Sequence, residues 1–268
     1  MPKYLLIPDV HGREFWREPV EKVLSEDNET EIVFLGDYVD PYPDEGISKE
    51  HALSVFRDIL LLKEENPDRI TLLLGNHDLH YINPGYMGHC RFDYERCDEI
   101  KGLLTVNHDM FSLCKIVECA NGKRVLLSHA GITKAWILSC EGIFGSYDIV
   151  QFDKYINPRF HENFEEEDKD LWKALSYISV YRGGQNHTGS LVWADLLEHT
   201  DVDERYQDFV QIFGHTQIKF PIHWIRDNEF YCLDCHKVFL MDENGDVDFY
   251  QKDDSSEMIL LSNKKTLT

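Results

Sequence analysis

Five short apolar runs along the chain have the length and composition of buried strands. They are rich in Leu, Ile and Val, and they span residues 4–7, 32–35, 70–74, 125–128 and 209–213. Between the second and third runs, apolar residues at helical spacing predict a helix from about residue 49 to residue 65, which Asn66-Pro67 ends. Strands that alternate with helical segments predict the α/β fold class.

Asp, Asn or His residues, which can ligate metal ions or transfer protons, follow each of these runs. The segments are Asp9-Val10-His11-Gly12, Gly36-Asp37-Tyr38-Val39-Asp40, Gly75-Asn76-His77-Asp78, His129-Ala130-Gly131 and Gly214-His215-Thr216. In open α/β sheets, ligands bind beyond the carboxyl ends of the strands, so we expect these segments to meet at one edge. A single Asn or His at a strand end is commonly a turn residue, but five such segments in chain order indicate a site.

The side chains in these segments offer oxygen and imidazole nitrogen but no thiolate. Such donors favour Mn²⁺, Fe or Zn²⁺. The candidate ligands are Asp9, His11, Asp37, Asn76, His129 and His215. These residues suffice for two divalent metal ions only if one carboxylate bridges the ions. Two ions about 3.5–4 Å apart are a recurring solution for phosphoester hydrolysis, because they generate hydroxide near neutral pH and clamp the phosphoryl oxygens.

The composition narrows the choice of partner. There are 49 Asp and Glu against 27 Lys and Arg, a formal net charge of −22. This excess disfavours bulk nucleic acid, which is held by clustered Lys and Arg, and it disfavours an anionic membrane surface. No apolar run is long enough for a signal peptide or a membrane span, and the 7 cysteines are scattered. Both observations predict reduced thiols and a cytoplasmic location.

Taken together, the five polar segments resemble the ordered motifs of the calcineurin-like metallophosphoesterase superfamily. They are most similar to its branch of Ser/Thr protein phosphatases and bacterial diadenosine tetraphosphatase-type enzymes. The segments run from Asp9 to His215, about three quarters of the chain. The resemblance implies a four-layer α/β/β/α sandwich with two mixed sheets. It also implies a single domain over residues 1–268, with a variable region around residues 134–200.

The resemblance also implies a role for each residue of the site. Asp9, His11 and Asp37 would hold the first metal ion. Asp37 would bridge to the second ion, whose other ligands would be Asn76, His129 and His215. His77 would act as general acid and protonate the leaving-group oxygen, with Asp40 orienting its imidazole ring.

The sequence departs from the family pattern at two positions. The family motif usually continues from Asp40 into Arg-Gly, and that Arg grips substrate phosphate, but this chain has Pro41-Tyr42-Pro43. Arg182 and Arg13 are the candidates to replace it; the alternative for both is ordinary surface solvation. Gln217 stands where many members have another metal-binding His, a feature shared with the protein phosphatase branch.

These features predict a two-metal phosphoesterase that hydrolyses a phosphate monoester, either a phosphoprotein or a small phosphorylated molecule. Cleavage of a dinucleoside polyphosphate is the alternative reaction. A non-catalytic binding scaffold on the same fold is the alternative of another class, but every ligand and acid position is filled by a competent residue. The sequence leaves the substrate, the native metals and the oligomeric state open.

Four other segments carry weaker predictions. Runs 238–241 and 247–250 flank a polar turn and predict a hairpin that completes the second sheet. The segment 81–106, with Tyr86, Phe92 and Tyr94, is predicted either to cover the site or to pack. The acidic run 162–170 is predicted as a solvated helix start or loop. Cys232 and Cys235 lack the second pair that a zinc site needs, so their role stays open between a strand pair and a redox contact.

Overall fold

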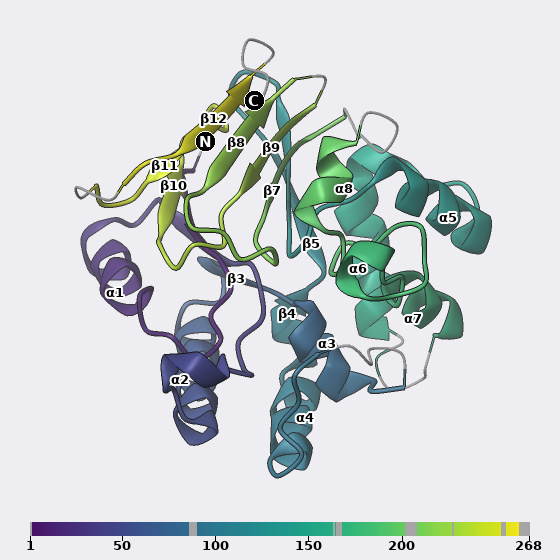
Figure 1. The fold of residues 1–268 in the computed structure, drawn as a ribbon. Coiled ribbons are helices and arrows are strands. Elements are labelled where there is room, and N and C mark those ends of the chain that lie inside the picture. The colour runs from purple at the N-terminus through teal and green to yellow at the C-terminus, as the bar shows by residue number, and fades with distance from the viewer. Residues whose placement is uncertain are drawn as a thin grey trace.

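Two mixed sheets form the upper part of the molecule in the view of Figure 1, with helices below them and to the right. The computed structural model describes residues 2–85, 90–162, 164, 168–201, 208–226, 228–252 and 256–262. The first sheet has the order β11-β10-β1-β2-β3-β4, with bounds Val247–Phe249, Phe239–Met241, Tyr4–Ile7, Glu31–Phe34, Ile70–Leu73 and Phe111–Ser112. The second has the order β12-β8-β9-β7-β6-β5, with bounds Ile259–Ser262, Ile222–Ile225, Glu229–Cys232, Val210–Phe213, Arg124–Ser128 and Cys114–Glu118.

Helices fall into two groups on either side of the strands. One group comprises α1 (Arg17–Glu26), α2 (Lys49–Glu65), α3 (Asn76–Ile82) and α4 (Cys97–Val106). The other comprises α5 (Lys134–Phe144), α6 (Phe152–Glu162), α7 (Lys169–Leu175) and α8 (Leu196–Thr200), which lie together on the right of Figure 1. The second group occupies the region around 134–200 that was expected to vary. No helix in the described ranges has both the length and the apolar character needed to cross a bilayer.

Alternating side chains bury both faces of the first sheet. In β1, Leu5 belongs to the core cluster that includes Phe56 of α2, whereas Leu6 packs between the sheets with Leu127 of β6. Successive side chains of a strand point to opposite faces, so a continuous apolar run is what a strand covered on both sides needs. Phe230 of β9 packs on the outer face of the second sheet, against Leu196 of α8. The predicted four-layer α/β/β/α sandwich with two mixed sheets is therefore confirmed.

The elements predicted from the apolar runs are present. The five predicted strands correspond to β1, β2, β3, β6 and β7, and the predicted helix is α2. The side chain of Ser48 accepts a hydrogen bond from the backbone N–H of His51 and so caps α2, and the helix ends at Glu65, before Asn66-Pro67. Strands β4, β5, β8, β9 and β12 were not predicted.

The C-terminal hairpin forms, but it joins a different sheet from the one expected. Strands β10 and β11 pair antiparallel, and β10 pairs with β1 of the first sheet, with Leu5 opposite Leu240. The prediction that the hairpin completes the second sheet is wrong. Phe239 and Met241 are buried between the two sheets. A strand at the edge of either sheet could bury the same alternating apolar residues there, so the sequence pattern does not distinguish the two sheets.

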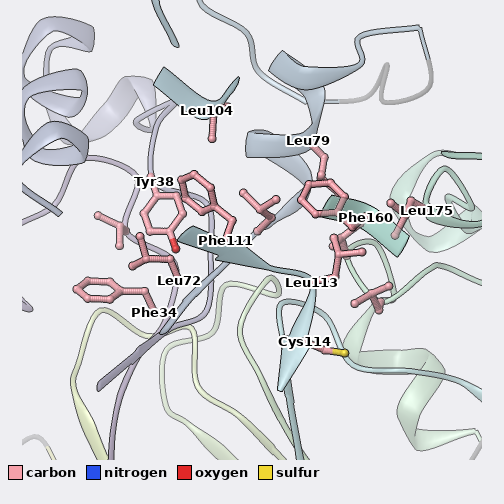
Figure 2. Packing of buried hydrophobic residues seen from close by; sticks show 14 of the residues in the cluster. Phe34, Tyr38, Leu72, Leu79, Leu104, Phe111, Leu113, Cys114, Phe160 and Leu175 are labelled. Atoms are coloured by element: carbon pink, nitrogen blue, oxygen red, sulfur yellow. The ribbon is translucent and has the colours of Figure 1, made fainter. Parts of the chain in front are cut away.

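An aromatic core supports the loops that follow β2 and β3. The ring of Tyr38 stacks on Phe56 with centroids 5.2 Å apart, and its hydroxyl donates to the carbonyl oxygen of Leu73 at 2.8 Å. Figure 2 shows this group continuing through Phe111 toward Phe160 of α6. One cluster of buried side chains therefore connects the first sheet to the second helical group and holds the Gly36–Asp40 loop in place.

Candidate active site

The five polar segments meet at one end of the two sheets. His11 follows β1 and Asp37 follows β2 in the first sheet, whereas His129 and His215 follow β6 and β7 in the second. The Nε2 atom of His129 lies 3.4 Å from Asp37 Oδ2, and the Nε2 atom of His11 lies 3.5 Å from the same oxygen. His11 and His129, which follow strands of different sheets, therefore meet at the carboxylate of Asp37, and the backbone of His215 bonds Asp9 across 206 residues of sequence.

Asp37 is common to two groups of side chains that could each hold a metal ion. One group is His11, Asp37 and His77, and the other is Asp37, His129 and His215; within each group the ligand atoms lie within 4.8 Å of one another. All five side chains are buried. A carboxylate shared by two such groups has the position that a bridging ligand needs.

Asn76 and Asp9 lie at the margins of these groups. Asn76 Oδ1 is 3.0 Å from His129 Nε2, and its Nδ2 donates to Cys90 Sγ at 3.1 Å. The carboxylate of Asp9 accepts from the backbone N–H of His215, at 2.9 Å and 3.1 Å. The structure thus places all six predicted ligands near one another, and it also groups His77 with His11 and Asp37.

Four of the site residues have unusual backbone conformations. His11, Asp37, Asp40 and His215 all have positive φ, between 45° and 62°. This left-handed region is unfavourable for residues with a Cβ atom and is tolerated where the surroundings enforce it, commonly at functional sites. The backbone of Gly75 approaches the Asp37 carboxylate so closely that a Cβ atom at this position would overlap with Asp37 Oδ1.

The carboxylate of Asp78 ties the two central loops together. It accepts hydrogen bonds from the backbone N–H groups of Gly75 and Asp37, both at 2.8 Å, and of Tyr38 at 3.1 Å. Burial, with the neighbouring charge of Asp37, raises the pKa of Asp78 to about 7. Asp78 belongs to the motif after β3, and its supporting role was not predicted from the sequence.

Replacing Asp78 by alanine is expected to lower the free energy of unfolding by about 2–4 kcal/mol, because three buried N–H groups lose their acceptor. Urea unfolding followed by circular dichroism would measure the change. Asp44 is exposed in the turn Pro43–Glu45, so Asp44→Ala serves as the control and should change stability by less than about 0.5 kcal/mol. Equal stability of the two variants would show that Asp78 does not anchor these loops.

Burial and mutual charge shift the pKa values of the clustered groups in opposite directions. Burial holds the pKa of His11 and of His215 well below the usual value, so both imidazoles are neutral, the form that ligates metal. Burial also opposes protonation of His129, but Asp37 and Asp9 outweigh it and raise the pKa of His129 to about 10. Burial favours the neutral form of Asp37, yet His129 and His77 hold the pKa of Asp37 well below its usual range. Asp37 is therefore ionised beside a protonated His129, while His11 and His215 are neutral.

His77 stands next to this cluster with its own carboxylate partner. His77 Nδ1 lies 2.8 Å from Asp40 Oδ2, and the imidazole ring stands 5.0 Å from that of His11. The hydroxyl of Tyr81 donates to Asp40 Oδ1 and accepts from the backbone N–H of Asp93 at 2.7 Å. Tyr81 was not predicted to support the site, although it follows His77 by four residues on α3, and residues at that spacing share one helix face.

The comparison with known families decides what this arrangement belongs to. Residues 2–219 match the family model of the calcineurin-like phosphoesterases. The chain belongs to this family. Its resemblance to the family, read from the five polar segments, is thereby confirmed.

Individual relatives agree with the family assignment. The chain is 28% identical over 127 residues to the serine/threonine-protein phosphatase 6 catalytic subunit of Drosophila melanogaster, a match that covers 47% of this chain and 38% of that protein. The chain thus spans about two fifths of the length of this curated relative. A cold-active protein tyrosine phosphatase shares the fold with a TM-score of 0.57 at 16% identity, over 96% of this chain and 81% of that one. A serine/threonine phosphatase from Saccharomyces cerevisiae has a TM-score of 0.50 at 14% identity, over 94% and 81%.

In this calcineurin-like phosphoesterase, the two arginines predicted to bind substrate each pair with a carboxylate. Arg13 is buried and binds Glu45 through two nitrogens, at 2.6 Å and 2.9 Å. Arg182 Nε lies 2.8 Å from Asp195 Oδ2, and its Nη2 donates to Thr216 Oγ1. Arg182 nevertheless lies beside His215, because the same Nη2 is 3.4 Å from the carbonyl oxygen of that residue.

The segment between α3 and α4 packs beside the acid–base pair. Phe92 stacks on Tyr81 with centroids 4.5 Å apart, whereas Tyr94 is exposed and touches Phe92 edge-on. Tyr86 lies outside the described residues. Packing against Tyr81 therefore accounts for Phe92, while Cys90 of the same segment contacts the predicted ligand Asn76.

The remaining predicted segments have structural roles where they are described. Asp168 caps α7 by accepting from two backbone N–H groups, as a helix start would, while 163 and 165–167 lie outside the described residues. Cys232 ends β9, and its thiol donates to the carbonyl oxygen of Gly214 at 3.7 Å. Cys232 and Cys235 are both free thiols. Cys232 therefore supports the segment that carries His215.

Proposed function

We propose that this calcineurin-like phosphoesterase is a two-metal enzyme that hydrolyses phosphate monoesters. The observation that carries the proposal is the carboxylate of Asp37, which belongs to two potential metal-ligand groups, one of which includes His77 of the His77–Asp40 pair. Two cation sites beside a positioned acid suit the transfer of a phosphoryl group to water.

The residues fit two divalent metal ions. The donors are carboxylate and amide oxygens and imidazole nitrogens, a set suited to Mn²⁺, Fe or Zn²⁺. His215 Nε2 is buried and has no hydrogen-bond partner in the described part of the chain, as expected for a nitrogen that ligates a metal ion. We assign the first ion to Asp9, His11 and Asp37, and the second to Asp37, Asn76, His129 and His215. Bound there, the ions would lower the pKa of water and neutralise phosphoryl oxygens.

His77 has the geometry of the general acid. Its Nδ1 is occupied by Asp40, so its Nε2 is the nitrogen free to pass a proton to the leaving-group oxygen. Asp40 is in turn held by a hydrogen bond from the hydroxyl of Tyr81. The protein thus holds one proton donor in one orientation beside the metal groups.

The substrate class follows from charge and from relatives. The net charge of −22 disfavours long polyanions such as nucleic acid, whereas a small ester or a single phosphorylated side chain can reach a local cationic centre. The curated relative is named a serine/threonine-protein phosphatase, which supports a phosphoprotein or a small phosphorylated molecule as substrate. The complete set of ligand and acid positions favours an enzyme over a binding scaffold.

Metal content and a substrate panel test the proposal. The purified protein is expected to contain two equivalents of divalent metal, to lose turnover after chelation, and to regain it with Mn²⁺. The panel is p-nitrophenyl phosphate, its bis ester, a phosphopeptide and diadenosine tetraphosphate. Turnover of the monoesters alone would support a phosphomonoesterase, and preferred cleavage of the tetraphosphate would support the pyrophosphate reaction instead. If nothing turned over with any divalent metal, the enzyme proposal would be wrong.

A further inference from the structure

Three arginines border the candidate metal groups, and they differ in how their charge is balanced. Arg13 pairs with Glu45, and Arg182 pairs with Asp195. For Arg91, no carboxylate partner is found within the described ranges of the chain. A guanidinium that is not already matched by a carboxylate is the one best able to receive an anionic ligand.

Neutral contacts hold Arg91 in place. Its Nη2 and Nε atoms donate to the carbonyl oxygen of Asp40 at 2.9 Å and 3.2 Å. Its guanidinium lies over the ring of Tyr42, 3.7 Å from the centroid, in a cation–π contact. The bonds to Asp40 use two of the five N–H donors of a guanidinium. The side chain is therefore fixed in orientation while its charge remains available.

Arg91 lies on the side of the site that holds the acid–base pair. The carbonyl that it binds belongs to Asp40, whose carboxylate pairs with His77. Tyr42, whose ring carries the guanidinium of Arg91, also contacts the imidazole of His11, with ring centroids 5.2 Å apart.

We propose that Arg91, stacked on Tyr42, binds a phosphoryl oxygen of the substrate on the His77 side of the site. The inference rests on the proposed phosphoesterase function and supplies a cation that the sequence lacks immediately after Asp40. A planar fork fixed by stacking suits two oxygens of one phosphate group. Arg91 thereby becomes a substrate-binding residue, contributed by the segment between α3 and α4 and not by the motif that follows β2.

Inorganic phosphate, the product, is the probe that separates binding from chemistry. Arg91→Ala is expected to raise the inhibition constant of phosphate and the KM for p-nitrophenyl phosphate by about 10- to 100-fold, the range of a lost charge-assisted hydrogen bond. Arg91→Lys keeps the charge but loses the fork and should give a smaller rise in both constants. Arg57→Ala is the matched control, because Arg57 is an exposed arginine of α2 that pairs with Glu99.

Two results would overturn the proposal. If Arg91→Ala lowered kcat while the phosphate inhibition constant stayed at the wild-type value, Arg91 would only position Asp40. If the alanine variant did not fold, an unchanged phosphate constant in the folded Arg91→Lys variant would lead to the same conclusion. Failure of the phosphoesterase function itself is distinguishable, because wild-type protein would then turn over no phosphate ester at all.

Discussion

Replacing Asp37 by alanine is expected to remove two-metal binding and to lower turnover by roughly three orders of magnitude or more. The carboxylate is the only side chain found in both candidate ligand groups of the described chain, so its loss weakens both sites together. Each tenfold in rate corresponds to about 1.4 kcal/mol of barrier, and the charge stabilisation supplied by metal ions is worth several kcal/mol. Metal analysis by mass spectrometry and initial rates with p-nitrophenyl phosphate would measure both effects.

A second variant separates lost charge from lost structure. Asp37 Oδ1 accepts from the backbone N–H of His77 at 3.0 Å, and the residue has a φ of 54°. Asp37→Asn keeps an acceptor and a residue that tolerates this conformation, so it should fold like the wild type and still lose metal. Asp44→Ala, at an exposed turn, should retain two equivalents. Two equivalents bound to Asp37→Ala would rule out the bridging role.

The part of the fold that the sequence could predict is the part in which local pattern and burial agree. Strands β1, β2 and β3 are buried on both faces, and so they read as unbroken apolar runs. Strand β5 is different, because Lys115 and Glu118 interrupt its apolar pattern and only Cys114 and Val117 of its residues are buried. Strand β12 is an exposed edge of the second sheet. Such strands acquire their structure from pairing, which a local pattern does not encode.

The candidate site also has a part that the sequence could predict and a part that it could not. Its six proposed ligands follow strands, and the ends of neighbouring strands must meet, so their proximity could be predicted from sequence order. Arg91 lies 51 residues from Asp40 along the chain, in a segment without regular structure. Only the folded chain brings its guanidinium to the Asp40 carbonyl. The carboxylates that pair with Arg13 and Arg182 could not be foreseen either, because each pairing depends on how two loops pack.

Replacing His77 by alanine is expected to lower kcat by about 10²- to 10⁴-fold, the usual contribution of a general acid. The metal content decides what this loss means. His77 also stands in one of the two potential ligand groups, with His11 and Asp37. If His77 is the acid, the variant keeps two equivalents of metal, because Asp9 serves the first ion in its place. If metal is lost in parallel with turnover, His77 is a ligand and the assignment of the acid is wrong.

The leaving group provides the sharper measurement. A general acid matters most when the departing oxygen is strongly basic, as in a serine phosphate, and least for p-nitrophenolate. His77→Ala should therefore lose more activity on a phosphoserine peptide than on p-nitrophenyl phosphate. Tyr81→Phe removes the hydroxyl that holds Asp40 and should show the same bias at smaller amplitude, since it loosens the acid without removing it. An equal loss on both substrates would mean that His77 stabilises the transferring phosphoryl group and does not protonate the leaving oxygen.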